Sequence, residues 1–340
     1  MESIMHHRTT AVLLALVAVT GVYAVPLSTT SLGKPLATVK LTKTEIIADK
    51  SFRDDVVALE TMRGKALTAD ERSAYLNDVI NDILFNQMCE RDGVKVSDGE
   101  VDGYITRLRA QRPAGETDAQ FAAFLATQGI PLDKLKEYYK KQFLVQRWLA
   151  KYRAKEIESM PKVQMSEILE TYDLYKARLV RPDTVRLSFL YFPYKDKTAA
   201  ESEKARTTMA DLSKRLEGGE SFDALRLKSQ AGGYVANKEP IYFEKSDVFR
   251  SQFGSEFFDT VFSLRDGTNS APFETPNGWF IIRRLEFLPQ KQLELTDPYR
   301  LGQPATVQAY IESQLAQQRE SQFISKTFND LFATLRSQAE

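Results

Sequence analysis

Few side chains in this chain are suited to acid–base or nucleophilic catalysis. The 340 residues include two histidines and one cysteine. His6 and His7 both lie within the first ten residues, ahead of an apolar run at residues 11–22. If that segment is removed, Ser–His–Asp catalysis, Cys–His catalysis and histidine-ligated metal sites are all excluded. We therefore expect no catalytic residues, no metal site and no cofactor.

Residues 1–24 have the organisation of a secretory signal. Arg8 precedes the apolar run, and Val22, Tyr23 and Ala24 place small residues at the two positions that signal peptidase reads. The run is shorter than the roughly 20 residues that a transmembrane helix needs. The sequence predicts export followed by cleavage after Ala24, and an uncleaved membrane anchor is the alternative.

The single thiol, Cys89, occurs in ILFNQMCERDG and cannot form an internal disulfide. No second cysteine, and no histidine beyond the predicted signal, is present to activate it. We interpret Cys89 as a small apolar residue on a helix, and a reactive thiol is the alternative.

The most specific pattern lies in GTNSAPFETPNGWFII, which begins at Gly267. Its spaced residues are Gly267, Ser270, Pro272, Thr275, Gly278 and Trp279. Supporting residues are Gly219 with Phe222, the pair Gly232 and Gly233, and Phe257 with Phe262. In order and spacing this set resembles the parvulin family of peptidyl-prolyl isomerases, whose motif reads Gly-x-x-Ser-x-Pro-x-x-Thr-x-x-Gly-aromatic-His.

The resemblance also shows which polar groups are missing. The histidine that parvulins carry in the first strand falls on Phe189, within VRLSFLYF. The histidine of the last strand falls on Phe280, within GWFII. The loop LKSQAGG is short and lacks the acidic or thiol residue that the family carries there. Three polar members of the family's active site are therefore absent together.

Rotation about an X–Pro bond crosses a barrier of about 18–20 kcal/mol. Lowering this barrier requires an apolar grip on the ring and polar groups around the rotating amide. Phenylalanine supplies only the grip, so we expect a degenerate pocket without efficient turnover. Its candidate peptide-binding residues are Phe189, Phe253, Phe257, Phe262 and Phe280. Plain core packing is the alternative for Phe189 and Phe280.

Helix signals dominate residues 40–180. Three capping-box patterns mark helix starts, namely Thr68 with Glu71, Ser97 with Glu100, and Thr117 with Gln120. The stripe after the first is formed by Leu76, Val79, Ile80, Ile83 and Leu84. This region is similar to the N-terminal domain of SurA-type periplasmic chaperones. The resemblance extends from ERSAYLNDVINDILFNQMCERDGVKVSD to KKQFLVQRWL.

The hydrophobic period changes at Pro182, where VRLSFLYFPY alternates as a strand does. A helix, a turn-rich stretch and the strand NGWFIIRRLEF complete an α+β domain. A polar connector then leads to a long amphipathic helix, whose apolar stripe we expect to pack on the N-terminal helices. The predicted fold is α+β: a mainly helical chaperone domain built from both ends of the chain, with a parvulin-like α+β domain inserted. The predicted ranges are 1–24 for the signal, 25–180 for the helical domain, 181–289 for the parvulin-like domain and 290–340 for the connector and C-terminal helix.

These resemblances imply a periplasmic, ATP-independent chaperone that binds unfolded outer-membrane or secreted proteins. The chain has 46 basic and 46 acidic residues, which argues against nucleic acid as a partner. It has no nucleotide-binding motif. We expect a monomer or weak dimer. An active parvulin-type isomerase and a scaffold with one dedicated partner are the alternatives.

Overall fold

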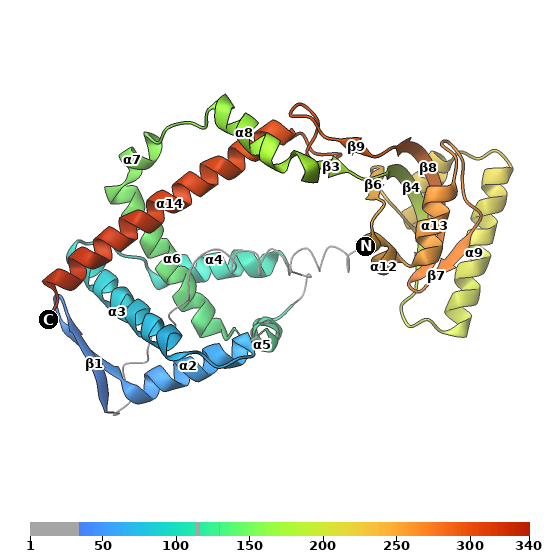
Figure 1. The fold of residues 1–340 in the computed structure, drawn as a ribbon. Coiled ribbons are helices and arrows are strands. Elements are labelled where there is room, and N and C mark those ends of the chain that lie inside the picture. Colours follow the sequence, from blue (N-terminus) through green and yellow to red (C-terminus); the bar gives the residue numbers. More distant parts are fainter. Residues whose placement is uncertain (1–33, 113–115, 129) are drawn as a thin grey trace. The chain divides into compact units, whose positions relative to one another are not determined.

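The computed structural model describes residues 34–112, 116–128 and 130–340 (Figure 1). The predicted signal lies outside this range. The chain divides into two compact units, one comprising Met1–Pro161 with Glu320–Glu340 and the other Lys162–Arg319. Described residues before Pro161 and after Glu320 therefore build one unit, which confirms the predicted helical domain with an α+β domain inserted. Within the described ranges, no helix is both long enough and apolar enough to cross a membrane.

The first unit is helical apart from one hairpin of β1 (Pro35–Lys40) and β2 (Thr44–Ala48). Its helices are α2 (Asp49–Arg63), α3 (Ala69–Arg91), α4 (Asp98–Ala110), α5 (Asp118–Thr127), α6 (Leu132–Tyr152), α7 (Ala154–Glu158) and the last part of α14 (Val307–Gln338). The capping boxes at Thr68, Ser97 and Thr117 are all formed, as predicted. Each places a side-chain acceptor on a helix N–H that has no partner within the helix.

The core of this unit is centred on α3. Phe85 packs edge-on against Trp148 of α6 and Phe328 of α14, with ring centroids 6.1 and 5.6 Å apart. Leu335 of α14 is buried in the same cluster. The predicted packing of the C-terminal helix on the N-terminal helices is therefore confirmed for this half of α14. A second cluster joins α4, α5 and α6.

A buried glutamine attaches the hairpin to α3. Gln87 has no exposed surface. Its Oε1 accepts the backbone N–H groups of Leu41, Thr42 and Lys43, at 2.9, 2.9 and 3.4 Å. Its Nε2 donates to Glu45 Oε1 at 3.0 Å. One side chain on α3 therefore fixes the turn between β1 and β2.

Asp55, on α2, gives this unit a specific pH dependence. Burial raises the pKa of its half-buried carboxyl to about 6, aided by Asp54 and Glu137 and opposed by Lys134. Its Oδ2 has no hydrogen-bond partner in the described structure. An unfolded aspartate titrates near pH 3.9, so the folded chain binds more protons between about pH 4 and pH 6. Stability contributed by the protonated carboxyl is therefore lost as the pH rises through this window.

We expect Asp55→Asn to stabilise the helical unit at pH 7.5 by about 1 kcal/mol, a value discounted for the partial exposure of the carboxyl. The gain should shrink towards zero at pH 4, where Asp55 is protonated in the parent chain. Urea unfolding at both pH values in a Trp279→Phe background, followed by the fluorescence of Trp148, measures this difference. Glu158→Gln is the control, because it removes an exposed carboxylate of the same unit that does not contribute to the shift at Asp55. An equal gain at both pH values would contradict the assignment.

The second unit contains a five-stranded antiparallel sheet in the order β5-β4-β8-β7, with β6 also paired to β4. Its strands are β4 (Thr184–Pro193), β5 (Val235–Ala236), β6 (Ile241–Glu244), β7 (Phe273–Thr275) and β8 (Gly278–Leu288). The helices are α9 (Ala199–Glu217), α10 (Phe222–Leu227), α11 (Ser229–Gly232), α12 (Asp247–Phe253) and α13 (Ser255–Ser263).

Alternation along β4 and β8 gives the sheet two apolar faces. Leu190 and Ile281 pack with α9 and α10 on one face. Phe189 and Phe280 pack with α12 and α13 on the other. Because both faces are covered, these strands contain few polar residues, and the predicted alternation of VRLSFLYF is confirmed.

A smaller cluster completes this unit. It joins α8 (Met165–Tyr175) to residues near Leu293 and to the first turns of α14. The Tyr172 hydroxyl donates to the Leu293 carbonyl oxygen at 2.9 Å, and Arg319 pairs with Glu167. The short strands β3 (Val180–Arg181) and β9 (Lys291–Gln292) pair beside this cluster, after the 3-10 turn Lys176–Arg178. The sequence predicts that α8 belongs to the helical domain of residues 25–180. In the structure, α8 instead packs on residues 293–315 of the second unit.

Candidate peptide-binding sites

The two phenylalanines at the family's histidine positions contact each other. β4 and β8 pair so that Phe189 lies opposite Ile282 and Tyr191 opposite Phe280. The ring centroids of Phe189 and Phe280 are 5.9 Å apart in an edge-to-face arrangement. Tyr191 stacks on Phe280 at 4.2 Å. Such ring pairs contribute roughly 0.5–1.5 kcal/mol each beyond their buried area.

The five predicted pocket residues lie in one cluster, but they fill the space. Phe189, Phe257 and Phe280 are 7%, 2% and 8% exposed, whereas Phe253 and Phe262 are half-buried. Phe257 contacts Phe280 at 5.1 Å and Phe253 at 5.1 Å between centroids. A cavity beside α12 and α13 has a volume of only about 10 Å³. That is room for about one water, so this cavity could not hold a proline ring.

The surviving polar residues of the parvulin-like motif hold the backbone. The Ser270 hydroxyl accepts the Ile282 N–H at 2.9 Å, and the Thr275 hydroxyl donates to the Gly278 carbonyl oxygen at 2.8 Å. Gly278 has φ of 148°, and an added Cβ would collide with the Phe192 carbonyl oxygen. Thr275 and Gly278 therefore shape the β7–β8 turn, and Ser270 holds the backbone of β8.

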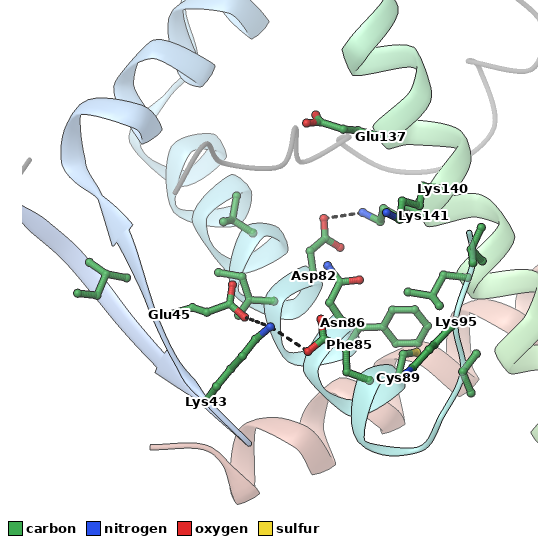
Figure 2. Close-up of a pocket in the computed structure, with 17 residues that line it drawn as sticks. Lys43, Glu45, Asp82, Phe85, Asn86, Cys89, Lys95, Glu137, Lys140 and Lys141 are labelled. Carbon is green, nitrogen blue, oxygen red and sulfur yellow. Dashed lines mark hydrogen bonds and ion pairs between the residues drawn. The ribbon is translucent and has the colours of Figure 1, made fainter. Parts of the chain in front are cut away.

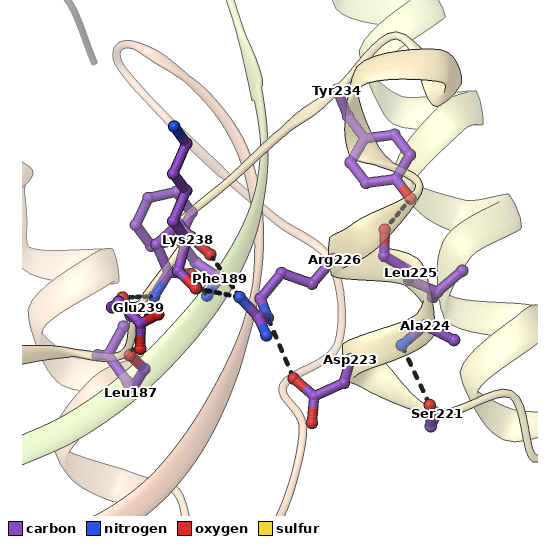
Figure 3. Close-up of polar contacts among 11 residues, drawn as sticks. Leu187, Phe189, Ser221, Asp223, Ala224, Leu225, Arg226, Tyr234, Lys238 and Glu239 are labelled. Carbon is purple, nitrogen blue, oxygen red and sulfur yellow. Dashed lines mark hydrogen bonds and ion pairs between the residues drawn. The ribbon is translucent and has the colours of Figure 1, made fainter.

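A buried asparagine bonded to the Phe189 backbone was not anticipated from the sequence. Figure 3 shows its surroundings, with Phe189, Arg226 and Lys238 labelled. Asn237 is 2% exposed. Its Oδ1 accepts the Phe189 N–H at 2.8 Å, and its Nδ2 donates to the Glu239 carbonyl oxygen at 2.7 Å. Arg226 donates to the Lys238 carbonyl oxygen next to it. Both polar atoms of the Asn237 amide are thus hydrogen-bonded to the backbone.

An open recess lies in the helical unit instead (Figure 2). We call it the α3 groove. Its volume is about 730 Å³. Its apolar lining residues are Ile46, Val79, Ile83, Phe85, Cys89, Val94, Val96 and Leu144. Its polar lining residues are Lys43, Glu45, Asp82, Asn86, Glu90, Lys95, Glu137, Lys140 and Lys141. β2, α3, residues 94–96 and α6 contribute to it, and no local sequence signal links these segments.

The charges around the α3 groove largely neutralise one another. Lys141 Nζ lies 2.6 Å from Asp82 Oδ2 (Figure 2). Lys43 Nζ lies 2.8 Å from Glu90 Oε2. Lys140 pairs with Asp98 at 2.7 Å. Burial raises the pKa of Asp82, an effect that Lys141 opposes. The rim is polar but offers no single-sign charge.

Cys89 lies in the wall of the groove but is only 1% exposed. Burial raises the pKa of its thiol to about 12. The thiolate is the reactive form of cysteine, and it is scarce at neutral pH with such a pKa. This environment favours the interpretation of Cys89 as an apolar core residue.

Two family models match separate parts of the chain. Residues 2–149 match a SurA-like N-terminal domain, and residues 163–297 match a PPIC-type PPIASE domain. Among curated proteins, the chain is 24% identical over 246 residues to Chaperone SurA of Methylobacillus flagellatus, covering 71% of this chain and 54% of that protein. It is 24% identical over 212 residues to Chaperone SurA of Pseudomonas putida, covering 62% and 47%. The chain thus spans about half the length of the curated relatives it matches.

Solved structures that match this chain superpose on it with low scores. One is described as one of two structurally related SurA-like chaperones in Campylobacter jejuni. It is 16% identical to this chain. The match covers 89% of this chain and 97% of that one, with a TM-score of 0.36.

Proposed function

The chain carries a SurA-like N-terminal domain and a PPIC-type peptidyl-prolyl isomerase domain, and on this premise we propose that it is a periplasmic, ATP-independent chaperone. Its clients in this proposal are unfolded outer-membrane or secreted polypeptides. The two relatives named above both bear the name Chaperone SurA, which supports the chaperone role. Holding an unfolded chain requires apolar surface that water can reach, and no nucleotide.

The observation that carries the proposal is the contact between Phe189 and Phe280. These rings occupy the positions of both family histidines and are buried against Phe257. Nothing in this cluster can hydrogen-bond to a twisted amide except the Tyr191 hydroxyl, which donates to the Asn277 carbonyl oxygen at 2.6 Å. The domain therefore retains the isomerase architecture while lacking its polar groups, and we assign it a structural or binding role.

We expect the exported chain to suppress aggregation without accelerating prolyl isomerisation. Light scattering of an unfolded outer-membrane β-barrel, diluted from urea, should fall when the chain is added at equimolar concentration. NMR exchange spectroscopy on a proline-containing peptide should show less than about a twofold change in the cis/trans exchange rate, because uncatalysed exchange takes tens of seconds or more.

An active parvulin provides the positive control for exchange, and serum albumin provides the control for non-specific suppression of scattering. Unchanged scattering with several clients would exclude the chaperone proposal. Exchange that accelerates many-fold at catalytic concentration would instead identify an active isomerase with a site free of histidine.

A further inference from the structure

The hydrogen-bonding register of the β1–β2 hairpin shows which backbone groups face outward. Lys40 exchanges two backbone hydrogen bonds with Glu340, at 3.1 and 2.9 Å. Its N–H and C=O therefore point away from its cross-strand partner, Thr44. In an antiparallel pair, bonded and non-bonded pairs alternate. Val39 and Glu45 consequently form a bonded pair, and Thr38 and Ile46 form a non-bonded one.

On β2, this alternation directs the backbone groups of Thr44 and Ile46 to the side away from β1. The sheet contains two strands, so that side of β2 has no partner strand among the described residues. Exposed strand edges are templates for pairing with another chain. The corresponding side of β1 is already bonded to Glu340 at Lys40.

The open edge of β2 borders the α3 groove. Glu45 and Ile46 both line the groove. Consecutive residues of a strand point to opposite faces, so a recess that touches both must meet the strand at its edge. Ile46 is 57% exposed, which is unusual for a large apolar side chain next to a recess with an apolar floor.

The chemistry of the groove selects the class of occupant. Its floor is apolar, and its lysines and carboxylates are largely paired with one another, as described above. A charged segment would gain little from such a rim, whereas an uncharged apolar segment would bury side chains on Val79, Ile83 and Leu144. A helical ligand would leave the outward backbone groups of β2 unpaired, but an extended ligand pairs them.

We propose that an extended, uncharged segment of an unfolded polypeptide adds to β2 as a third strand and places alternate side chains in the α3 groove. This inference rests on the proposed chaperone function and specifies where and how a client binds. Main-chain hydrogen bonds to Thr44 and Ile46 supply affinity with little dependence on client sequence. The groove adds a preference for apolar side chains at every second position.

Ile46→Pro tests the edge directly, with Thr38→Pro as the matched control. Proline removes an N–H and is tolerated on edge strands where that N–H does not pair within the sheet. Thr38 and Ile46 are cross-strand partners, so both variants keep the β1–β2 bonds and change opposite edges. The probe is a capped twelve-residue peptide in which Phe or Tyr alternates with Thr or Gln.

We expect Ile46→Pro to raise the Kd for this peptide about tenfold, the effect of one lost hydrogen bond together with perturbed packing, and Thr38→Pro to change it less than twofold. In the unsubstituted full chain, amide hydrogen exchange at Thr44 and Ile46 should slow about tenfold or more when the peptide binds. Exchange at Thr38 should not change. This second measurement does not depend on the folding of any variant.

Equal effects of the two prolines, or peptide binding without protection of Thr44 and Ile46, would overturn the proposal. So would a dimer of the free chain that Ile46→Pro converts to monomer, because the edge would then belong to a second copy. If the unsubstituted chain suppresses aggregation but Ile46→Pro does so equally well, only this inference fails. If the unsubstituted chain does not suppress aggregation, the proposed function itself fails.

Discussion

Phe280→Ala should lower the free energy of unfolding of the α+β domain by about 3–5 kcal/mol, as expected when a buried phenylalanine leaves a cavity. Phe280 is 8% exposed and contacts four rings, those of Phe189, Tyr191, Phe257 and Phe273. Strands β4 and β8 are held by an extensive ladder and cannot close around the vacated space. A loss of this size would populate the unfolded domain measurably near physiological temperature.

The two tryptophans make this measurement specific. Trp279 lies next to Phe280 on β8, whereas Trp148 lies in the helical unit. Urea unfolding in a Trp148→Phe background therefore reports the α+β domain. Phe258→Ala is the matched control, because Phe258 lies on α13 but is only half-buried, and it should cost about 1 kcal/mol. A cost below about 1 kcal/mol for Phe280→Ala, combined with weaker peptide binding, would identify the cluster as a working pocket rather than core.

Gln87→Leu should cost the helical unit about 2–3 kcal/mol. The substitution keeps a similar volume but removes the acceptor of three backbone N–H groups and the donor to Glu45. Each buried group left without a partner costs about 1–3 kcal/mol. Water can reach the exposed turn at Thr42 and Lys43, so the total loss is smaller than four such costs added together. Urea unfolding in a Trp279→Phe background, followed by Trp148, measures the loss.

Asn86→Leu provides the matched control for Gln87→Leu. Asn86 is the neighbour of Gln87 on α3, but its side chain is exposed in the groove wall, so its replacement should change stability by less than about 0.5 kcal/mol. Equal losses of stability in Gln87→Leu and Asn86→Leu would contradict the role given to Gln87. Gln87→Glu separates the two functions of the amide, since it keeps the acceptor but places a second carboxylate beside Glu45.

Local signals in the sequence predicted much of the fold. The capping boxes at Thr68, Ser97 and Thr117 need only four consecutive residues, so they could be recognised without knowing any tertiary contact. The alternation in β4 is equally local. Gly278 was identified through the resemblance to the parvulin motif, and its backbone conformation explains why that position holds glycine.

The candidate site was less predictable because its properties depend on distant contacts. The grouping of five phenylalanines followed from the resemblance, but whether they leave an open pocket depends on how rings from β4, α12, α13 and β8 meet. Asn237 and Gln87 carry no distinctive local signal, since Phe189, which Asn237 bonds, and Leu41, which Gln87 bonds, lie 48 and 46 residues away in sequence. The α3 groove, built from four separate segments, could not be read from any one of them.

The position of α14 has a consequence for how the molecule is made. Phe328 and Leu335 complete the core around Phe85, whose own helix ends at Arg91. A ribosome synthesises the chain from its N-terminus, so more than two hundred residues must be added after α3 before Phe328 and Leu335 can pack on it. Contacts of such long sequence separation form slowly. The five-stranded sheet and its helices, residues 184–288, are complete before α14 is synthesised and can pack first. Until α14 is synthesised, the helical unit therefore exposes the same kind of apolar surface that a client does.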